Sequence, residues 1–480
     1  MNKKSRALKI LCVAITMLLC FTGCGSNSDP NTTSNENSLP NMENVETEQR
    51  VSSDAETAAP IQEDNSISEI VTPNNQIVAT DLVPSKGFEF ESNDDGTCTI
   101  VGIGTCTDKD IVIPEKSPDG DIVTLIGEYA FMNIKDIDSV TLLNYIYEVD
   151  ERAFQYGEFT TLNIIGGSPV FRESAFSSCE YLASISFVSC NVQADKYAFY
   201  SCGKGADVTF SNCTGVINEN AFQYSDLINL TFSSSEIKIE KSAFSSCEKL
   251  ASIVFTDSTI EADEYAFYSC GKDADVTFSN CTGFFDESAF QYSDLINLTV
   301  RNSELEIGKS AFSSCEELES IVFTDSTIDA GEYAFYSCGD SAIVEMTNCS
   351  LVLDDRAFQY SSLDSLTITG SKAEIGESSF SSCKNLTSIT IDCDLTTLGE
   401  YAFYSCEDLT DVSICDNSKS DNEIKIDDQT FQYCKRLETV TVGNGNVEIG
   451  ESAFSGCTDS LTIIIAGKNY TADDIKDGMK

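Results

Sequence analysis

A phenylalanine, usually preceded by alanine, recurs along the chain every 22 or 23 residues from residue 126 onward. The fifteen anchor positions are Phe131, Phe154, Phe176, Phe199, Phe222, Phe244, Phe267, Phe290, Phe312, Phe335, Phe358, Phe380, Phe403, Phe431 and Phe454. One longer spacing, of 28 residues, precedes Phe431. A second period of 68 residues is superimposed, because units beginning FQY, FSSC and FYSC follow one another in a fixed order. Such regular spacing is typical of a repeat protein in which each unit forms one coil.

Within each unit, the apolar positions predict one short strand and one further buried corner. Six residues after Phe380 comes Leu386, which is followed by Ile389 and Ile391. The two isoleucines alternate with polar residues, and this period of two indicates a strand with alternate side chains inward. A second apolar position, such as Leu398, follows the next turn. One unit cannot bury these residues alone, so the units are expected to stack around a shared core.

The repeat resembles the BspA-like leucine-rich-repeat family, whose units read approximately AFxxCxxLxxIxIxxxxxxIGxx. The segments GFEF (residues 87–90) and GIGTCT (residues 102–107) also resemble the N-terminal capping strands of that family. The resemblance implies a right-handed solenoid with a parallel β-sheet on its concave face and short turns or 3-10 segments on its convex face. Capping strands are expected in residues 87–125, about fifteen coils in residues 126–470, and a C-terminal tail in residues 471–480.

The N-terminus has the zones of a secretion signal. Lys3, Lys4, Arg6 and Lys9 precede an apolar stretch at residues 10–21. This stretch is shorter than the roughly 20 residues that a membrane-spanning helix needs. A signal sequence is therefore predicted here, rather than a transmembrane anchor.

The sequence FTGC at residues 21–24 resembles the bacterial lipobox. The resemblance implies a signal peptide of residues 1–23, cleavage after Gly23 and attachment of a lipid to Cys24. An ordinary secretory signal that happens to contain this cysteine is the alternative. We expect the mature chain at the extracellular face of the cell membrane or envelope, held to the membrane by its lipid alone.

The segment after the lipidated cysteine, up to residue 86, is expected to be a disordered acidic linker. Residues 25–86 contain no aromatic residue, five of the eight prolines, and 11 acidic against 2 basic residues. Such a segment cannot bury enough apolar surface to offset its ordering entropy. It is suited to holding a domain away from the membrane.

The charge and the missing residue types exclude several classes of function. The chain carries 29 basic and 78 acidic residues, a formal charge of −49, which becomes −53 without residues 1–23. This charge repels nucleic acid. Because the chain has no histidine, it lacks the commonest general base and the commonest metal ligand. We therefore expect no catalytic residues, no metal and no cofactor, and a protein that is not an enzyme.

Many of the 21 cysteines belong to the repeat. Those three residues after an anchor are Cys179, Cys202, Cys247, Cys270, Cys315, Cys338, Cys383, Cys406, Cys434 and Cys457. FQY units carry Gly or Ser at this position, as at Ser225. We expect free buried thiols that pack as small hydrophobic side chains. Disulfides between neighbouring coils, such as Cys179 with Cys202, are the alternative, because the protein is predicted to leave the cytosol.

The outward positions of the predicted strands form the candidate binding face. Its residues are Asp207, Thr209, Asn229, Thr231, Asp275, Thr277, Asn297, Thr299, Glu345, Thr367 and Thr390. The simpler interpretation is that threonine suits an exposed strand face. Tyrosines beside the anchors, such as Tyr200 and Tyr224, are expected to cover the core on the convex side.

Three hypotheses of function follow. The first is a surface adhesion module that binds an extracellular protein, of host matrix or a neighbouring cell, or a glycan, since members of the resembled family are associated with adhesion to extracellular-matrix proteins. The second is an envelope scaffold without a dedicated ligand. The third and weakest is a protein that binds or degrades polysaccharide, because paired carboxylates are abundant in so acidic a chain.

Overall fold

A computed structural model describes residues 82–415, 424–443 and 446–479. The chain divides into Met1–Asn74 and Asn75–Lys480, and all described residues belong to the second unit. The expected signal peptide, the lipid site at Cys24 and nearly all of the expected linker lie outside the described residues. In the part that is described, no helix is both long and apolar enough to cross a membrane.

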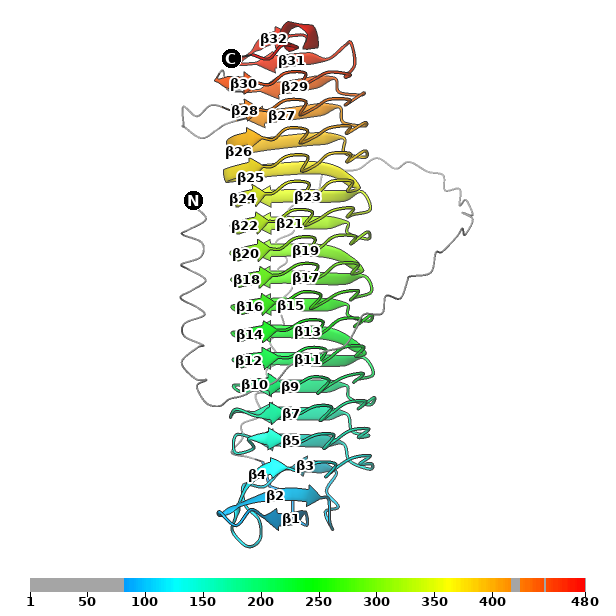
Figure 1. The fold of residues 1–480 in the computed structure, drawn as a ribbon, viewed down its shortest axis with the longest axis vertical. Helices are drawn as coiled ribbons and strands as arrows, with labels where there is room; N and C mark the ends of the chain where they lie inside the picture. The colour runs from blue at the N-terminus through cyan, green and yellow to red at the C-terminus, as the bar shows by residue number, and fades with distance from the viewer. Residues whose placement is uncertain (1–81, 416–423, 444–445, 480) are drawn as a thin grey trace, which may run out of the picture. The chain divides into compact units, whose positions relative to one another are not determined.

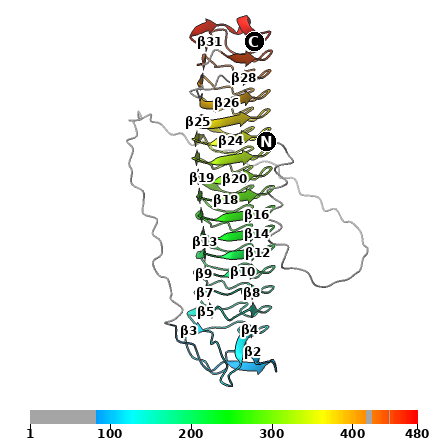
Figure 2. The same cartoon turned by 90° about the vertical axis from the view of Figure 1, so that its left-hand side faces the viewer.

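The second unit is a solenoid built on two ladders of parallel strands, which lie side by side in Figures 1 and 2. The longer strands form one ladder, in the order β3 (Asp110–Val112), β5 (Ser139–Leu143), β7 (Thr161–Ile165), β9 (Ser184–Val188), β11 (Ala206–Ser211), β13 (Leu227–Ser233), β15 (Ser252–Thr256), β17 (Ala274–Ser279), β19 (Leu295–Arg301), β21 (Ser320–Thr324), β23 (Ala342–Thr347), β25 (Leu363–Ile375), β26 (Ser388–Leu398), β27 (Asp411–Cys415), β29 (Thr439–Val442) and β31 (Thr462–Ile465). The predicted parallel solenoid is thereby confirmed.

The shorter strands form the second ladder, one turn further along each coil. They are β2 (Thr97–Gly102), β4 (Ile122–Ile126), β6 (Glu148–Val149), β8 (Val170–Phe171), β10 (Asn191–Ala194), β12 (Thr214–Ile217), β14 (Glu236–Ile239), β16 (Thr259–Ala262), β18 (Thr282–Phe285), β20 (Glu304–Ile307), β22 (Thr327–Ala330), β24 (Ser350–Leu353), β28 (Ile424–Ile426) and β30 (Val447–Ile449). The strands β25 and β26 run through the corner and connect β24 to β28.

The alternation of side chains in each long strand follows the predicted period of two. In β15, Ile253 and Phe255 are fully buried, whereas Ser252, Val254 and Thr256 are partly exposed. The same inward positions on neighbouring strands are in register, so one continuous hydrophobic core runs through the stack.

Each coil has a third side, which carries neither ladder. The anchor phenylalanines form a column of stacked rings inside this side of the solenoid. Every anchor is buried, from Phe131 to Phe454. The ring of Phe290 lies 4.6 Å from that of Phe267 and 4.8 Å from that of Phe312, with interplanar angles of 7° and 6°. Each ring is therefore covered by the coil before it and the coil after it, as the repeat predicts.

The third side is made of turns that have their own hydrogen bonds between coils. The amide of Phe290 donates to the carbonyl of Ala311 at 2.6 Å. Two residues before and two after this anchor, Ser288 and Tyr292 have φ of 60° and 58°. We call this side the turn side. The same pair of left-handed residues flanks every anchor, so turns, rather than 3-10 segments, form it.

Both ends of the stack are closed by antiparallel pairs. At the N-terminal end, β1 (Glu89–Ser92) pairs with β2. At the C-terminal end, β32 (Lys468–Tyr470) pairs with β31, and the 3-10 helix η2 (Ala472–Ile475) buries Ile475. Residues 471–479, expected only as a tail, thus contain part of the cap.

The cysteines after the anchors are free thiols that lie in the core, as predicted, except Cys457 near the C-terminal end, which is only partly buried against it. The thiol of Cys247 donates to the carbonyl of Phe222 at 3.3 Å. In the FQY units a serine does the same, because the hydroxyl of Ser225 donates to the carbonyl of Phe199 at 2.9 Å. Burial raises the pKa of the Cys383 thiol to about 12 and raises the pKa of the Cys247 thiol well above its usual range. These thiols therefore stay protonated and unreactive at neutral pH.

Substituting a central anchor is expected to cost more stability than substituting the last one. Phe290→Ala removes a ring with a stacked neighbour on each side, and we expect a loss of about 3–5 kcal/mol. Phe454→Ala removes a ring with one stacked neighbour, Phe431, and should cost clearly less. Denaturant unfolding of the two variants measures the difference. Equal losses would contradict a stack held by contacts between neighbouring coils.

The buried thiols predict a loss of stability at alkaline pH. In the unfolded chain they ionise near pH 9, whereas in the folded chain Cys383 stays neutral up to about pH 12. The free energy of unfolding should therefore fall as pH rises from about 9 toward 12, by at most about 1.4 kcal/mol per pH unit for each thiol. Melting temperatures at pH 7 and pH 10.5 (about one and a half units above the onset) measure this fall.

Serine provides the matched control, because it makes the same hydrogen bond in the FQY units but does not ionise. For the variant Cys247→Ser/Cys315→Ser/Cys383→Ser, the melting temperature should fall less between the two pH values than it does for the parent. An identical loss in parent and variant would assign the alkaline effect to other groups.

Candidate binding surface

The outer surface of the long-strand ladder, here called the strand face, carries the predicted binding residues in two adjacent rows. The first row contains Asp207, Asn229, Asp275 and Asn297. The second contains Thr209, Thr231, Thr277, Thr299, Glu345, Thr367 and Thr390. Paired strands place Asp207 beside Asn229 and Thr209 beside Thr231. The structure thus brings the predicted residues together on one surface.

Side-chain hydrogen bonds join two pairs of neighbouring coils within the first row. The amide nitrogen Nδ2 of Asn229 donates to Oδ1 of Asp207 at 2.6 Å. Sixty-eight residues later, Asn297 Nδ2 donates to Asp275 Oδ1 at 2.7 Å. These bonds fix the orientation of both carboxylates, because an amide donor holds one oxygen of each. The second carboxylate oxygen remains available as an acceptor.

The second row differs, because hydroxyl groups replace charges over most of its length. Four of its threonines are half-buried, because neighbouring strands lie only about 4.8 Å apart and their side chains cover one another. They are Thr209, Thr231, Thr277 and Thr299. Glu345 is exposed and is the acidic member of this row. The strand face is therefore a mainly polar platform, in which Val254 and Val322 interrupt the second row.

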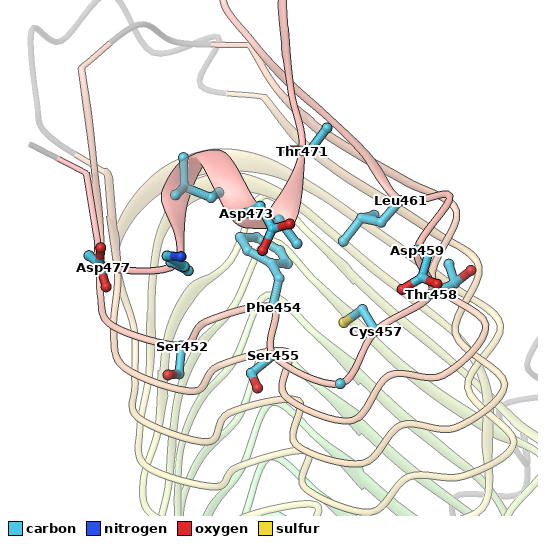
Figure 3. Close-up of a pocket in the computed structure, with 14 residues that line it drawn as sticks. Ser452, Phe454, Ser455, Cys457, Thr458, Asp459, Leu461, Thr471, Asp473 and Asp477 are labelled. Carbon is cyan, nitrogen blue, oxygen red and sulfur yellow. The ribbon is translucent and has the colours of Figure 1, made fainter.

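A cavity lies elsewhere, between the last coil and η2 (Figure 3). Its volume is about 580 Å³, and its lining includes Phe454, Cys457, Asp459, Asp473 and Asp477. Its carboxylates come from η2 and the loops of the cap, and none of the predicted strand-face residues lines it.

Sequence reasoning missed a polar row at the corner between the two ladders. Asn280 Nδ2 donates to Asp257 Oδ1 at 2.9 Å, and Asn348 Nδ2 donates to Asp325 Oδ1 at 3.1 Å. All four residues have positive φ, a conformation that Asn and Asp adopt more readily than most residues. In the sequence, these Asn and Asp residues directly follow each long strand, and this position could have predicted the row. The row extends the polar surface beyond the strand face.

The expectation for the tyrosines is wrong for those of the FQY units. Tyr224, Tyr292 and Tyr360 leave 54%, 55% and 55% of their surface exposed, so they do not cover the core. Tyr200 and Tyr268 of the FYSC units are half-buried. The two sets differ in backbone position, because each FQY tyrosine occupies the left-handed position two residues after its anchor, whereas Tyr200 and Tyr268 directly follow theirs.

The chemistry that these surfaces offer is recognition through hydroxyl, amide, carboxylate and aromatic groups. Among the described residues, no group of three or more His, Cys, Asp or Glu side chains could hold a metal ion. The expected lack of a metal, a cofactor and catalytic residues stays a prediction for the chain as a whole.

Comparison with known families matches most of the repeat region. A family model for the BspA type leucine-rich repeat region matches residues 106–228, 215–342 and 351–475. No curated protein matches the chain significantly.

Solved structures of bacterial leucine-rich-repeat proteins are similar at low identity. A leucine-rich repeat protein from Bacteroides ovatus is 20% identical over 80% of this chain and 94% of that chain, with a TM-score of 0.38. A leucine-rich cell surface protein from Faecalibacterium prausnitzii is 19% identical, over 81% and 96% of the two chains, with a TM-score of 0.25. The pneumococcal vaccine antigen PcpA is 14% identical, over 80% and 98%, with a TM-score of 0.26.

Proposed function

Because the chain belongs to the BspA-type leucine-rich-repeat family, we propose that it is a cell-surface adhesion protein whose strand face binds an extracellular macromolecule. The observation that carries this proposal is the polar platform itself, where paired strands hold the two rows in register and only Val254 and Val322 interrupt the second row between Thr209 and Thr390. A solenoid offers such a surface to large ligands without a pocket.

The proposed location follows from the N-terminal sequence and the family. Cys24, in its lipobox-like context, would attach the chain to the outer face of the membrane or envelope. The acidic segment up to residue 86 would hold the solenoid away from the lipid surface, since its charges repel one another. Membrane contact would then be through the lipid alone.

The proposed ligand is an extracellular protein, because the strand face combines fixed carboxylates with rows of hydroxyl groups. Oriented carboxylates such as that of Asp207, held by Asn229, suit lysine and arginine side chains on a partner. Specific recognition should survive physiological salt. Attraction to the net negative charge alone should weaken, since the Debye length is only about 8 Å at about 0.15 M ionic strength.

A pair of arginine substitutions on the strand face should weaken binding to its ligand. Thr209→Arg/Thr277→Arg places two long cationic side chains on β11 and β17, within the proposed contact surface. We expect the full chain to bind at least one member of a panel of immobilised extracellular-matrix proteins, saturably and at about 0.15 M salt. The variant should bind that protein at least tenfold more weakly, a loss of about 1.4 kcal/mol, measured by surface plasmon resonance.

The control variant makes the same substitutions in the same coils, but on the short-strand ladder. Thr214 and Thr282 are exposed on β12 and β18, so Thr214→Arg/Thr282→Arg changes the charge equally. This variant should bind like the parent. Equal losses in both variants would assign the binding to net charge, and an absence of saturable binding to every protein would favour the scaffold hypothesis.

A further inference from the structure

The turn side carries clusters of three tyrosines that recur with the 68-residue period. In one cluster, the Tyr265 and Tyr268 ring centroids are 5.3 Å apart at 86°, and those of Tyr268 and Tyr292 are 5.6 Å apart at 81°. Equivalent clusters are centred on Tyr200, Tyr336 and Tyr404. Each cluster spans two neighbouring coils, so four similar aromatic sites follow one another along one side of the solenoid.

Backbone conformation indicates that the fold does not need these tyrosines to cover its surface. Tyr265 and Tyr292 have φ of 62° and 58°, a region in which a bulky residue is unfavourable. At the position of Tyr292, the FSSC and FYSC units carry serine instead, as at Ser246 and Ser269. The fold therefore does not require tyrosine there. Tyrosine therefore stands at a position that the fold also fills with serine, although the left-handed backbone is unfavourable for a bulky side chain.

The lysines beside three of the four clusters are already paired with carboxylates. The ammonium of Lys241 lies 5.2 Å from the Tyr265 ring centroid and 2.7 Å from the Glu264 carboxylate. Lys309 has the same relation to Tyr333 and Glu332, at 5.6 Å and 3.1 Å. The cation is thus balanced within the cluster. Since the chain as a whole is strongly acidic, an acidic ligand would be repelled from these sites.

From these observations we infer that the tyrosine clusters form a binding track for a neutral polysaccharide. Exposed tyrosine offers a rigid ring and a phenol hydroxyl, which match the apolar face and the hydroxyl groups of a sugar ring. The clusters recur every three coils, about 15 Å apart, so a polymer of identical units can occupy several of them at once. A polymer also needs no pocket, because binding at several weak sites gives high avidity.

The inference goes beyond the proposed protein-binding function and uses a different side of the molecule. An experiment can therefore contradict the proposal for the strand face and the proposal for the turn side independently of each other. A variant of the strand face such as Thr209→Arg/Thr277→Arg should bind polysaccharide as the parent does.

Affinity electrophoresis of the full chain tests the track. The gels contain, one at a time, a β-1,4-glucan, a β-1,3-glucan, an α-glucan and a galactomannan, with polygalacturonate as the acidic comparison. We expect at least one neutral polymer to retard the protein and polygalacturonate to have no such effect. The variant Tyr224→Ser/Tyr292→Ser/Tyr360→Ser should lose about a hundredfold in apparent affinity, because three of the four sites are removed.

The protein's own repeats make the substitutions safe for folding, since serine occupies the equivalent left-handed positions in other coils. The matched variant Tyr224→Phe/Tyr292→Phe/Tyr360→Phe keeps the rings and should keep most of the binding. Lack of retardation in every neutral polymer would overturn the inference. So would equal retardation of the parent and the serine variant, stronger retardation by polygalacturonate, or a serine variant that loses only protein binding.

Discussion

Each coil of this protein buries its phenylalanine largely against the anchor rings of the neighbouring coils. The ring centroids of successive anchors are 4.6–5.4 Å apart through the column, and the turn carrying one anchor bonds to the turn of the next coil. No coil can therefore be stable by itself. The closing hairpin of β1 and β2 and the cap around Ile475 follow from the same constraint, since the terminal coils would otherwise expose one face of the core.

This arrangement leaves each of the three sides free to carry different residues on its surface. The inward positions are occupied by Phe, Leu, Ile, Val, Ala and Cys with little variation. Outward, the long strands carry Thr, Ser, Asp and Asn, whereas the turns carry Tyr, Lys and Glu. A ligand therefore meets the same groups at regular intervals along one side, and that regularity favours extended partners over small molecules.

Spacing alone predicted the solenoid, the inward residues and the column of anchors, because burial enforces strict periodicity at positions such as Phe290 and Ile253. It also placed Asp207 and Thr209 on an outward face. It missed the exposure of Tyr292, since no sequence rule predicts a left-handed conformation at tyrosine or serine. The hydrogen bond between Asn280 and Asp257 was also missed. The two side chains meet only because the coil between them has 23 residues, which brings both to the same corner.

Amide hydrogen exchange tests the central claim most directly. If each anchor turn is bonded to the next coil, anchor amides such as those of Phe222, Phe290 and Phe358 should exchange as slowly as the neighbouring strand amides, although they lie in turns. Protection should decrease toward both ends of the stack. Fast exchange of the central anchor amides, alongside protected strands, would contradict a column held together through its turns.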